Sequence, residues 1–314
     1  MTESSGTGKY EQLLARCKEV RAISTAVAHP CDDAALGAVV EAARAGIIEP
    51  ILCGPAERIR RVAKQLSVDV DRYEIVDVPH SHGAAARAVE LVRMGRAEVL
   101  MKGSLHTDEL MAEVVKRDTG LRTDRRVSHV FIMDVPSYHK PLMITDAAVN
   151  IFPTLDDKRD IVQNAVNLAH ALGITRPKVA ILSAVETVTS KIPSTLEAAA
   201  LCKMADRGQI TGAVLDGPLA FDNAISTEAA RIKHITSPVA GDADILVVPD
   251  LEAGNMLAKN LTFMARADAA GIVLGARAPI ILTSRADNER TRLASCAVAA
   301  LYANARRAMS PVAA

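Results

Sequence analysis

Short apolar segments alternate with longer amphipathic segments along almost the whole chain, and this alternation restricts the fold more than any other feature. EPILCG (49–54) and AEVLMKG (97–103) have the length of buried strands. The segments CDDAALGAVVEAARAG (31–46) and PAERIRRVAKQL (55–66) repeat apolar residues at helical spacing. A regular succession of strand and helix predicts an α/β fold, in which helices cover both faces of a mostly parallel sheet.

One region breaks this alternation. RVSHVFIMDV (126–135) and PLMITDAAV (141–149) read as two strands, and the loop between them is too short to contain a helix. We therefore expect the junction between two domains in this part of the chain.

Composition excludes several classes of partner. Lys and Arg together number 37, as do Asp and Glu, so no net charge favours a nucleic acid. The longest apolar stretch, residues 271–282, is too short to span a membrane, and the first residues do not resemble a signal peptide. We expect a soluble, cytoplasmic protein with neither nucleic acid nor membrane as partner.

The five cysteines do not have the spacing of a metal site, and we expect no metal. Reduced thiols are the simplest interpretation. For Cys31 and Cys296, a small buried apolar residue is favoured over a reactive thiol.

Ligands of doubly wound sheets bind beyond the carboxyl ends of the strands, so polar residues at these points are candidates. In LMKGSLHTDEL (100–110), Gly103 would let a ligand approach the backbone and Lys102 could bind a phosphate. The alternative is an ordinary turn, with Thr107 or Asp108 capping the next helix.

Two further segments carry candidates. In VVPDLEAGNMLAKN (247–260), Asp250 and Glu252 follow a strand, and Gly254 and Asn255 open a helix. These carboxylates could bind a metal or act as a base, but helix capping is the favoured alternative. Arg122, in the basic segment GLRTDRRVSH (120–129), belongs either to a solvated loop or to the ligand cleft.

The segment LTSRADNERT (282–291) joins a buried strand to the last helix. Ser284 is not a hydrolase nucleophile, because the glycines of a GxSxG turn are absent. Arg285 at a helix N-terminus favours an anion site. Asp287 is either the cap of the last helix or a base.

Together, six segments resemble the phosphate acetyl/butyryltransferase family, in family order over nearly the whole chain. The short motifs MKG, GLRT and LTSRAD are closer in sequence to the butyryl branch. The matching segments are LMKGSLHTDELMAEVV, GLRTDRRVSHVFIMDVP, ITDAAVNIFP, KMADRGQITGAVLDGPLAFDNAIS, AGDADILVVPDLEAGNMLAKNL and GARAPIILTSRAD.

The resemblance implies a phosphate acyltransferase, which moves an acetyl or butyryl group reversibly between coenzyme A and inorganic phosphate. Coenzyme A, acyl-CoA, phosphate and acyl phosphate would be its small-molecule partners, with no tightly bound cofactor. It also implies a homodimer and two doubly wound α/β domains in an isopropylmalate-dehydrogenase-like architecture, with the active site in the interdomain cleft. Residues 1–146, completed by 283–314, would form the first domain, and residues 147–282 the second.

The implied mechanism is direct attack of the coenzyme A thiolate on acyl phosphate. The family motif assigns Ser284 to the oxyanion and Arg285 to the phosphate. The acetyl branch has its catalytic carboxylate where this chain has Thr291, so we assign the base to Asp287, with Glu289 as the other choice. The remaining candidates for substrate binding are Lys102, Gly103, Arg122, Asp250, Gly254 and Asn255.

Two other functions are compatible with parts of this pattern. One is a non-catalytic acyl-CoA-sensing regulatory domain, against which the intact Ser284-Arg285 pair argues. The other is a metal- and NAD-dependent decarboxylating dehydrogenase-like enzyme, which would recruit Asp216, Asp222 and Asp250. No GxGxxG follows an early strand, so this alternative ranks last.

Overall fold

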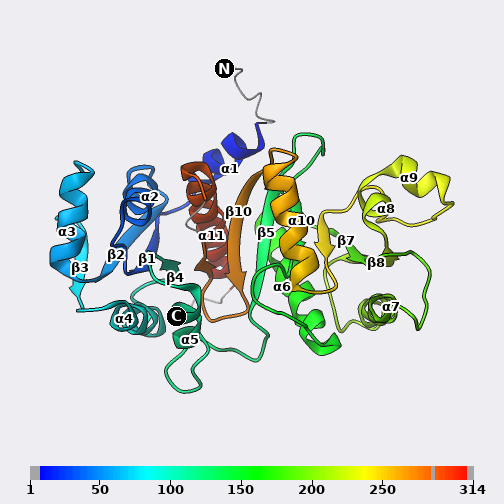
Figure 1. Cartoon of the computed structure of the whole chain (residues 1–314), viewed down its shortest axis with the longest axis horizontal. Coiled ribbons are helices and arrows are strands. Elements are labelled where there is room, and N and C mark those ends of the chain that lie inside the picture. Colours follow the sequence, from blue (N-terminus) through cyan, green and yellow to red (C-terminus); the bar gives the residue numbers. More distant parts are fainter. Residues whose placement is uncertain (1–7, 284–286, 310–314) are drawn as a thin grey trace. The chain divides into compact units, whose positions relative to one another are not determined.

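The computed structural model describes residues 8–283 and 287–309. The chain divides into two compact units. We call residues 8–9 and 126–269 the central unit, and residues 10–125, 270–283 and 287–309 the N/C unit. Each unit consists of strands alternating with helices, which confirms the predicted α/β class (Figure 1).

The unit boundaries differ from those expected from the sequence. The chain changes units at 125/126 and 269/270, whereas we expected changes at 146/147 and 282/283. The two strands of the interrupted region form an antiparallel pair, in which Val130 lies opposite Thr145. This pairing keeps residues 128–145 within the central unit.

Within its described residues, the N/C unit contains six strands, five of which are parallel. Its strand order is β3-β2-β1-β4-β11-β10, and only β10 runs antiparallel to its neighbour β11. Its elements are α1 (Lys9–Cys17), β1 (Ile23–Ala28), α2 (Asp33–Arg44), β2 (Ile48–Gly54), α3 (Ala56–Gln65), β3 (Glu74–Asp77), α4 (Ser81–Arg93), β4 (Val99–Lys102), α5 (Thr107–Val114), β10 (Asp268–Leu274), β11 (Ile280–Ile281) and α11 (Glu289–Met309).

Helices cover both faces of this sheet, as the sequence predicts. Helix α2 contacts α3 and α11, whereas α4 contacts α5. Figure 1 shows α2 and α3 on one side of β1 and β2, and α4 and α5 on the other. The helical spacing of α2 places Leu36, Val39 and Val40 in the core, where they are almost fully buried.

The central unit has the strand order β5-β6-β9-β7-β8, in which only β5 is antiparallel to its neighbour. Its core includes Met133, Ile144, Leu182 and Leu246. Its elements are β5 (Ser128–Asp134), β6 (Leu142–Thr145), α6 (Leu155–Ala171), β7 (Lys178–Leu182), α7 (Pro193–Asp206), β8 (Val214–Leu219), α8 (Phe221–Ile225), α9 (Thr227–Ile232), β9 (Ile245–Val247) and α10 (Leu251–Phe263).

Among the described residues, no helix combines the length and the hydropathy that crossing a bilayer requires.

Candidate active site

The strand order of the N/C unit reverses between β1 and β4, and ligands of doubly wound sheets bind where the order reverses. Ala28 and Lys102 lie opposite each other at the carboxyl ends of these two strands. The segment LMKGSLHTDEL therefore lies at the switch point, as its polar residues suggested. Its helix, α5, has His106 at the capping position without a side-chain bond, so neither Thr107 nor Asp108 is the cap.

Gly103 lets the ends of β1 and β4 meet. A Cβ atom on this residue would lie 2.4 Å from the Ala28 oxygen and 2.5 Å from the His29 oxygen. Instead, the Gly103 amide donates to the Ala28 carbonyl at 2.8 Å, and the Ser104 amide donates to the His29 carbonyl at 2.9 Å. The glycine is thus required by the neighbouring backbone, and its contact with a ligand stays a prediction.

Ser104 fixes His29 beside this turn. Its hydroxyl donates to the His29 carbonyl at 2.8 Å and lies 3.1 Å from the imidazole Nδ1. It also accepts from the Cys31 amide at 3.2 Å. Because the hydroxyl proton is used on the carbonyl, Nδ1 is assigned as the donor and Nε2 as the acceptor.

His29 is held neutral and in an unusual backbone conformation. Its φ of 56° lies in the left-handed region that residues other than glycine rarely adopt. Burial lowers its pKa, and the Arg58 guanidinium lowers it further, against the opposing effects of Glu109 and Asp32. The sequence analysis missed this residue, because a single histidine after a strand carries no signal of its own.

A small cavity of about 100 Å³ opens beside the switch point. Two cationic side chains line it, and Lys102 and Arg292 are each only 7% exposed. Two cationic groups in the wall of one cavity attract negative charge, so the cavity favours an anionic ligand over a cationic one. The complete lining comprises Asp32, Ala34, Ala35, Ala38, Met101, Lys102, Gly103, Thr283 and Arg292.

The hydrogen bonds of these two cations fix their positions. Lys102 Nζ donates to the carbonyls of Gly103 and Leu105, both at 3.1 Å. Arg292 Nη1 donates to the Ala34 carbonyl at 2.8 Å. Asp32, the carboxylate in the lining, caps α2 by accepting from the Ala35 amide at 2.7 Å. Backbone carbonyls therefore help to hold both cations in place.

Arg292 is the second site residue that the sequence analysis missed. It directly precedes the apolar run LASCAVAAL (293–301), which is buried throughout the first turns of α11. A cation within the buried part of a helix needs a functional or structural explanation. A charged residue beside a buried apolar run was therefore the sequence signal that could have identified Arg292.

The cap of α11 is Asn288, so of the two roles considered for Asp287 the structure does not support capping. Asn288 Oδ1 accepts from the Thr291 amide at 2.8 Å, and its carbonyl accepts from the Arg292 amide at 3.2 Å. Asp287 is partly buried and lines a hollow of about 550 Å³. That hollow is lined by Asp33, Ala34, Gly37, Ala38, Asp287, Asn288, Glu289, Arg290 and Arg292.

Ser284 and Arg285 lie outside the described residues. Their neighbours Thr283 and Asp287 line the small cavity and the hollow, respectively.

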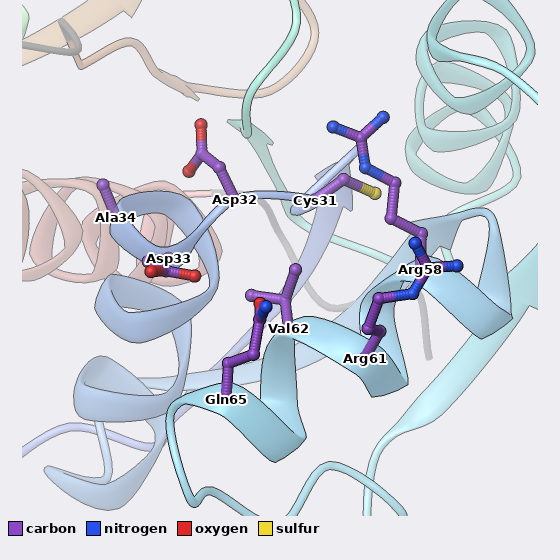
Figure 2. A pocket seen from close by; sticks show the side chains of 8 residues that line it. All are labelled: Cys31, Asp32, Asp33, Ala34, Arg58, Arg61, Val62 and Gln65. Carbon is purple, nitrogen blue, oxygen red and sulfur yellow. The ribbon is translucent and has the colours of Figure 1, made fainter.

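A second hollow, of about 560 Å³, lies between the first turn of α2 and helix α3 (Figure 2). Cys31 forms part of its lining, and burial raises the pKa of this thiol to about 11. Burial likewise raises the pKa of Cys296 to about 12. Both cysteines are buried and free, as predicted.

The basic segment before the central unit has two environments. Arg126 Nε donates to Asn150 Oδ1 at 2.6 Å and lies 3.6 Å from Asp157. It therefore stabilises the central unit. Arg122 is exposed, and its predicted contact with substrate stays a prediction.

The candidates of the central unit have structural contacts. Asp250 caps α10 by accepting from the Ala253 amide at 2.9 Å, which confirms the favoured interpretation. A Cβ on Gly254 would lie 2.8 Å from the Asp146 oxygen, and Asn255 Nδ2 donates to the Ala147 carbonyl at 3.1 Å. These contacts join α10 to the loop after β6, and the predicted substrate contacts of all three residues stay predictions.

The aspartates invoked for a dehydrogenase do not converge. Asp216 lies within β8 and Asp222 lies in α8, while Asp250 caps α10. Among residues 8–283 and 287–309, no three His, Cys, Asp or Glu side chains are grouped closely enough to hold a metal.

A doubly wound α/β unit with two buried cations beside its switch point defines a protein that binds an anionic ligand. Comparison with known proteins narrows this class to one family. The family profile described as Phosphate acetyl/butaryl transferase matches residues 80–300.

Curated relatives match nearly the full length. A Rhizobium meliloti phosphate acetyltransferase is 69% identical over 96% of this chain and 95% of its own length. A Clostridium acetobutylicum phosphate butyryltransferase is 45% identical over 92% of this chain and 95% of its own. Three short motifs favoured the butyryl branch, whereas the more similar of these two relatives has the acetyl name.

The fold has a counterpart among solved structures. The crystal structure of a branched-chain phosphotransacylase from Enterococcus faecalis superimposes with a TM-score of 0.80 and 32% identity, covering 90% of this chain and 99% of the other. The chain belongs to the Phosphate acetyl/butaryl transferase family.

Proposed function

We propose that this chain transfers an acetyl group reversibly between coenzyme A and inorganic phosphate. The observation that carries the proposal is the pair of buried cations, Lys102 and Arg292, beside one small cavity at the switch point. The name of the 69% identical relative supports acetyl as the group transferred.

The small cavity would hold the phosphate. At about 100 Å³ it is large enough for a phosphate group. Lys102 and Arg292 supply two positive charges, and the family motif assigns Arg285 to the same ion. Paired cations stabilise the negative charge that develops on phosphate as it leaves the acyl group. Arg122 is proposed as a further ligand, at an exposed position.

The base would be Asp287. Because Asn288 caps α11, Asp287 is not needed for that role, and it lines the same hollow as Arg292. A thiol resembling that of cysteine has a pKa of about 8.5 and must lose its proton to attack. Asp287 accepts this proton, and the thiolate sulfur bonds to the carbonyl carbon of acetyl phosphate.

The tetrahedral intermediate then collapses. Its C–O bond to phosphate breaks, and the electron pair leaves with the phosphate oxygen. Ser284 is proposed to donate to the intermediate's oxyanion, a contribution that amounts to about 3 kcal/mol in comparable sites. Asp287 then releases the thiol proton to solvent, which returns the protein to its starting state. The proposed steps use only the two substrates and these side chains, so the proposal includes no tightly bound cofactor.

Release of free thiol from acyl-CoA in the presence of phosphate tests the reaction. We expect turnover with acetyl-CoA to exceed that with butyryl-CoA. Arg285→Ala should reduce kcat/KM by about 100-fold or more, while the circular dichroism spectrum stays that of the parent. Failure of both acyl-CoA substrates to react would contradict the proposal. Binding of acyl-CoA without phosphate-dependent turnover would instead favour the regulatory domain.

A matched pair of variants tests the base. Asp287→Asn should reduce kcat by about 100-fold or more. Glu289→Gln should have little effect, because Glu289 is exposed on the first turn of α11. The reverse result would move the base to Glu289.

We also propose that the protein forms a homodimer through the central unit. Large apolar side chains are exposed on and beside α10, and such exposure is typical of an interface. Phe263 is 75% exposed, and Leu251 of α10 donates to the Ile151 carbonyl, next to the exposed Phe152. The exposed residues are Ile151, Phe152, Met256, Phe263 and Met264.

A further inference from the structure

The hollow between α2 and α3 has no role in the reaction as described so far. One wall is the loop after β1 with the first turn of α2, and the other is one face of α3 (Figure 2). The residues of α3 that face it follow helical spacing. The first wall consists of Cys31, Asp32, Asp33 and Ala34, and the second of Arg58, Arg61, Val62 and Gln65.

Arg58 is the cation of this hollow that is available for a ligand. Its side chain is exposed, and no carboxylate among the described residues lies within ion-pair distance of it. Figure 2 shows its side chain extending beside Cys31, with Arg61 next to it on α3. Arg61 forms an exposed ion pair with Glu57 at 3.5 Å, which contributes little to stability and can exchange for a ligand.

The positive charge of Arg58 extends toward the interior of the switch point. It lowers the pKa of both His29 and Cys31, in each case as a secondary cause after burial. Two carboxylates also belong to the lining. Asp32 is held as the cap of α2, and Asp33 is exposed to solvent. An anion placed against α3 would therefore meet the arginines first.

The hollow is continuous in its lining with the proposed reaction site. It shares Asp32 and Ala34 with the small cavity. It shares Asp33 and Ala34 with the hollow that Asp287 lines. The first turn of α2 thus borders all three spaces. A ligand whose reactive end lies beside Arg292 could extend past this turn to Arg58.

Coenzyme A has this shape. Its thiol ends a long flexible arm, and its other end is an adenosine that carries a 3′-phosphate and a 5′-diphosphate. A hollow of about 560 Å³ is much larger than a phosphate needs, and it offers guanidinium groups together with the apolar Val62 and Ala34. Guanidinium groups bind phosphate with two parallel hydrogen bonds, and apolar side chains can pack against a base.

We propose that this hollow binds the phosphorylated adenosine end of coenzyme A, with Arg58 as the principal phosphate ligand and Arg61 as the second. The proposal rests on the proposed function, because it takes coenzyme A as the substrate. It assigns to α3 the recognition of the nucleotide, separate from the residues that carry out the transfer.

Comparison of coenzyme A with pantetheine tests the site, because pantetheine has the thiol arm without the nucleotide. For Arg58→Ala, the ratio of kcat/KM for coenzyme A to that for pantetheine should fall about tenfold, the loss expected for one charge-assisted hydrogen bond. Arg58→Lys should retain part of that ratio. Arg60→Ala is the matched control, since Arg60 lies on the same helix, is exposed and faces Asp71 at 3.4 Å.

Calorimetry separates failure of the site from failure of the proposed function. Weaker binding of coenzyme A to Arg58→Ala, with unchanged binding to Arg60→Ala, supports the site. Equal affinity of Arg58→Ala and the parent protein for coenzyme A overturns it, as does an equal loss with pantetheine. Absence of turnover in the parent protein would contradict the transferase reaction, while the binding comparison would still decide the site.

Discussion

Substitution of Gly103 by alanine tests why a glycine stands at the switch point. The added Cβ would lie 2.4 Å from the Ala28 oxygen, 2.5 Å from the His29 oxygen and 2.6 Å from the His29 carbonyl carbon. All three are backbone atoms of the chain leaving β1, so no side-chain rotation relieves the overlap. The ends of β1 and β4 must separate by about 1 Å to restore ordinary contact.

The cost follows from that separation. The Gly103 amide now donates to the Ala28 carbonyl at 2.8 Å, and the Ser104 amide to the His29 carbonyl at 2.9 Å. After the separation, both N···O distances would exceed hydrogen-bond length. Two lost hydrogen bonds contribute about 1 kcal/mol each, and the remaining overpacking about 1–3 kcal/mol. We expect Gly103→Ala to lower the free energy of unfolding by about 3–5 kcal/mol.

Gly37 provides the matched control. It lies within α2, and a Cβ on it would meet nothing within 4 Å. Gly37→Ala should therefore raise the free energy of unfolding by about 0.5–1 kcal/mol, because alanine is the better helix former. Guanidinium unfolding followed by circular dichroism measures both variants. If Gly103→Ala proved as stable as the parent and lost only ligand affinity, the glycine would serve the ligand, and the backbone argument would be refuted.

Further predictions concern the site, the pH dependence and the surface. Arg292→Ala should raise the KM for phosphate about tenfold or more in steady-state kinetics, and an unchanged value would exclude it from the phosphate site. Burial lowers the pKa of His129 from about 6.5 to about 4, against the smaller effect of Asp146. Between these two pH values the unfolded chain therefore binds a proton that the folded chain does not. The free energy of unfolding should fall between pH 6.5 and 4, and His129→Gln should flatten this slope; an unchanged slope would contradict the assignment. Phe263→Glu should convert a dimer to a monomer by light scattering, whereas a dimeric variant would place the interface elsewhere. Cys31 and Cys296 should react slowly with a thiol reagent at neutral pH, because burial raises their pKa values to about 11 and 12; rapid labelling before unfolding would refute this.

Part of the site was predictable because it depends on position along a strand. Lys102 and Gly103 follow a buried apolar run, and the carboxyl ends of parallel strands lie at one edge of a sheet. The antiparallel pair at 128–145 was likewise visible as two strand-like runs without an intervening helix. The sequence did not show that this strand pair belongs to the central unit, because pairing preferences between distant strands leave no local pattern.

Other parts could not be predicted from local patterns. Asp287 and Asn288 are both good capping residues, and only the hydrogen bond from the Thr291 amide shows which one caps α11. Asp250 had two possible roles in the same way, and its bond from the Ala253 amide identifies the cap. Capping depends on backbone torsion angles, which neighbouring side chains alone do not fix.

The sequence alone determined the α/β class, the alternation of strands and helices, and the motifs that indicate the family. Periodicity and motif spacing are local properties, and they survive without knowledge of the packing. The tertiary structure decided that Lys102 and Arg292, 190 positions apart, share one cavity, and that Arg58 lies beside the first turn of α2. The reason is that the order of strands in the sheet brings these segments together, and that order is set by the packing of the whole unit.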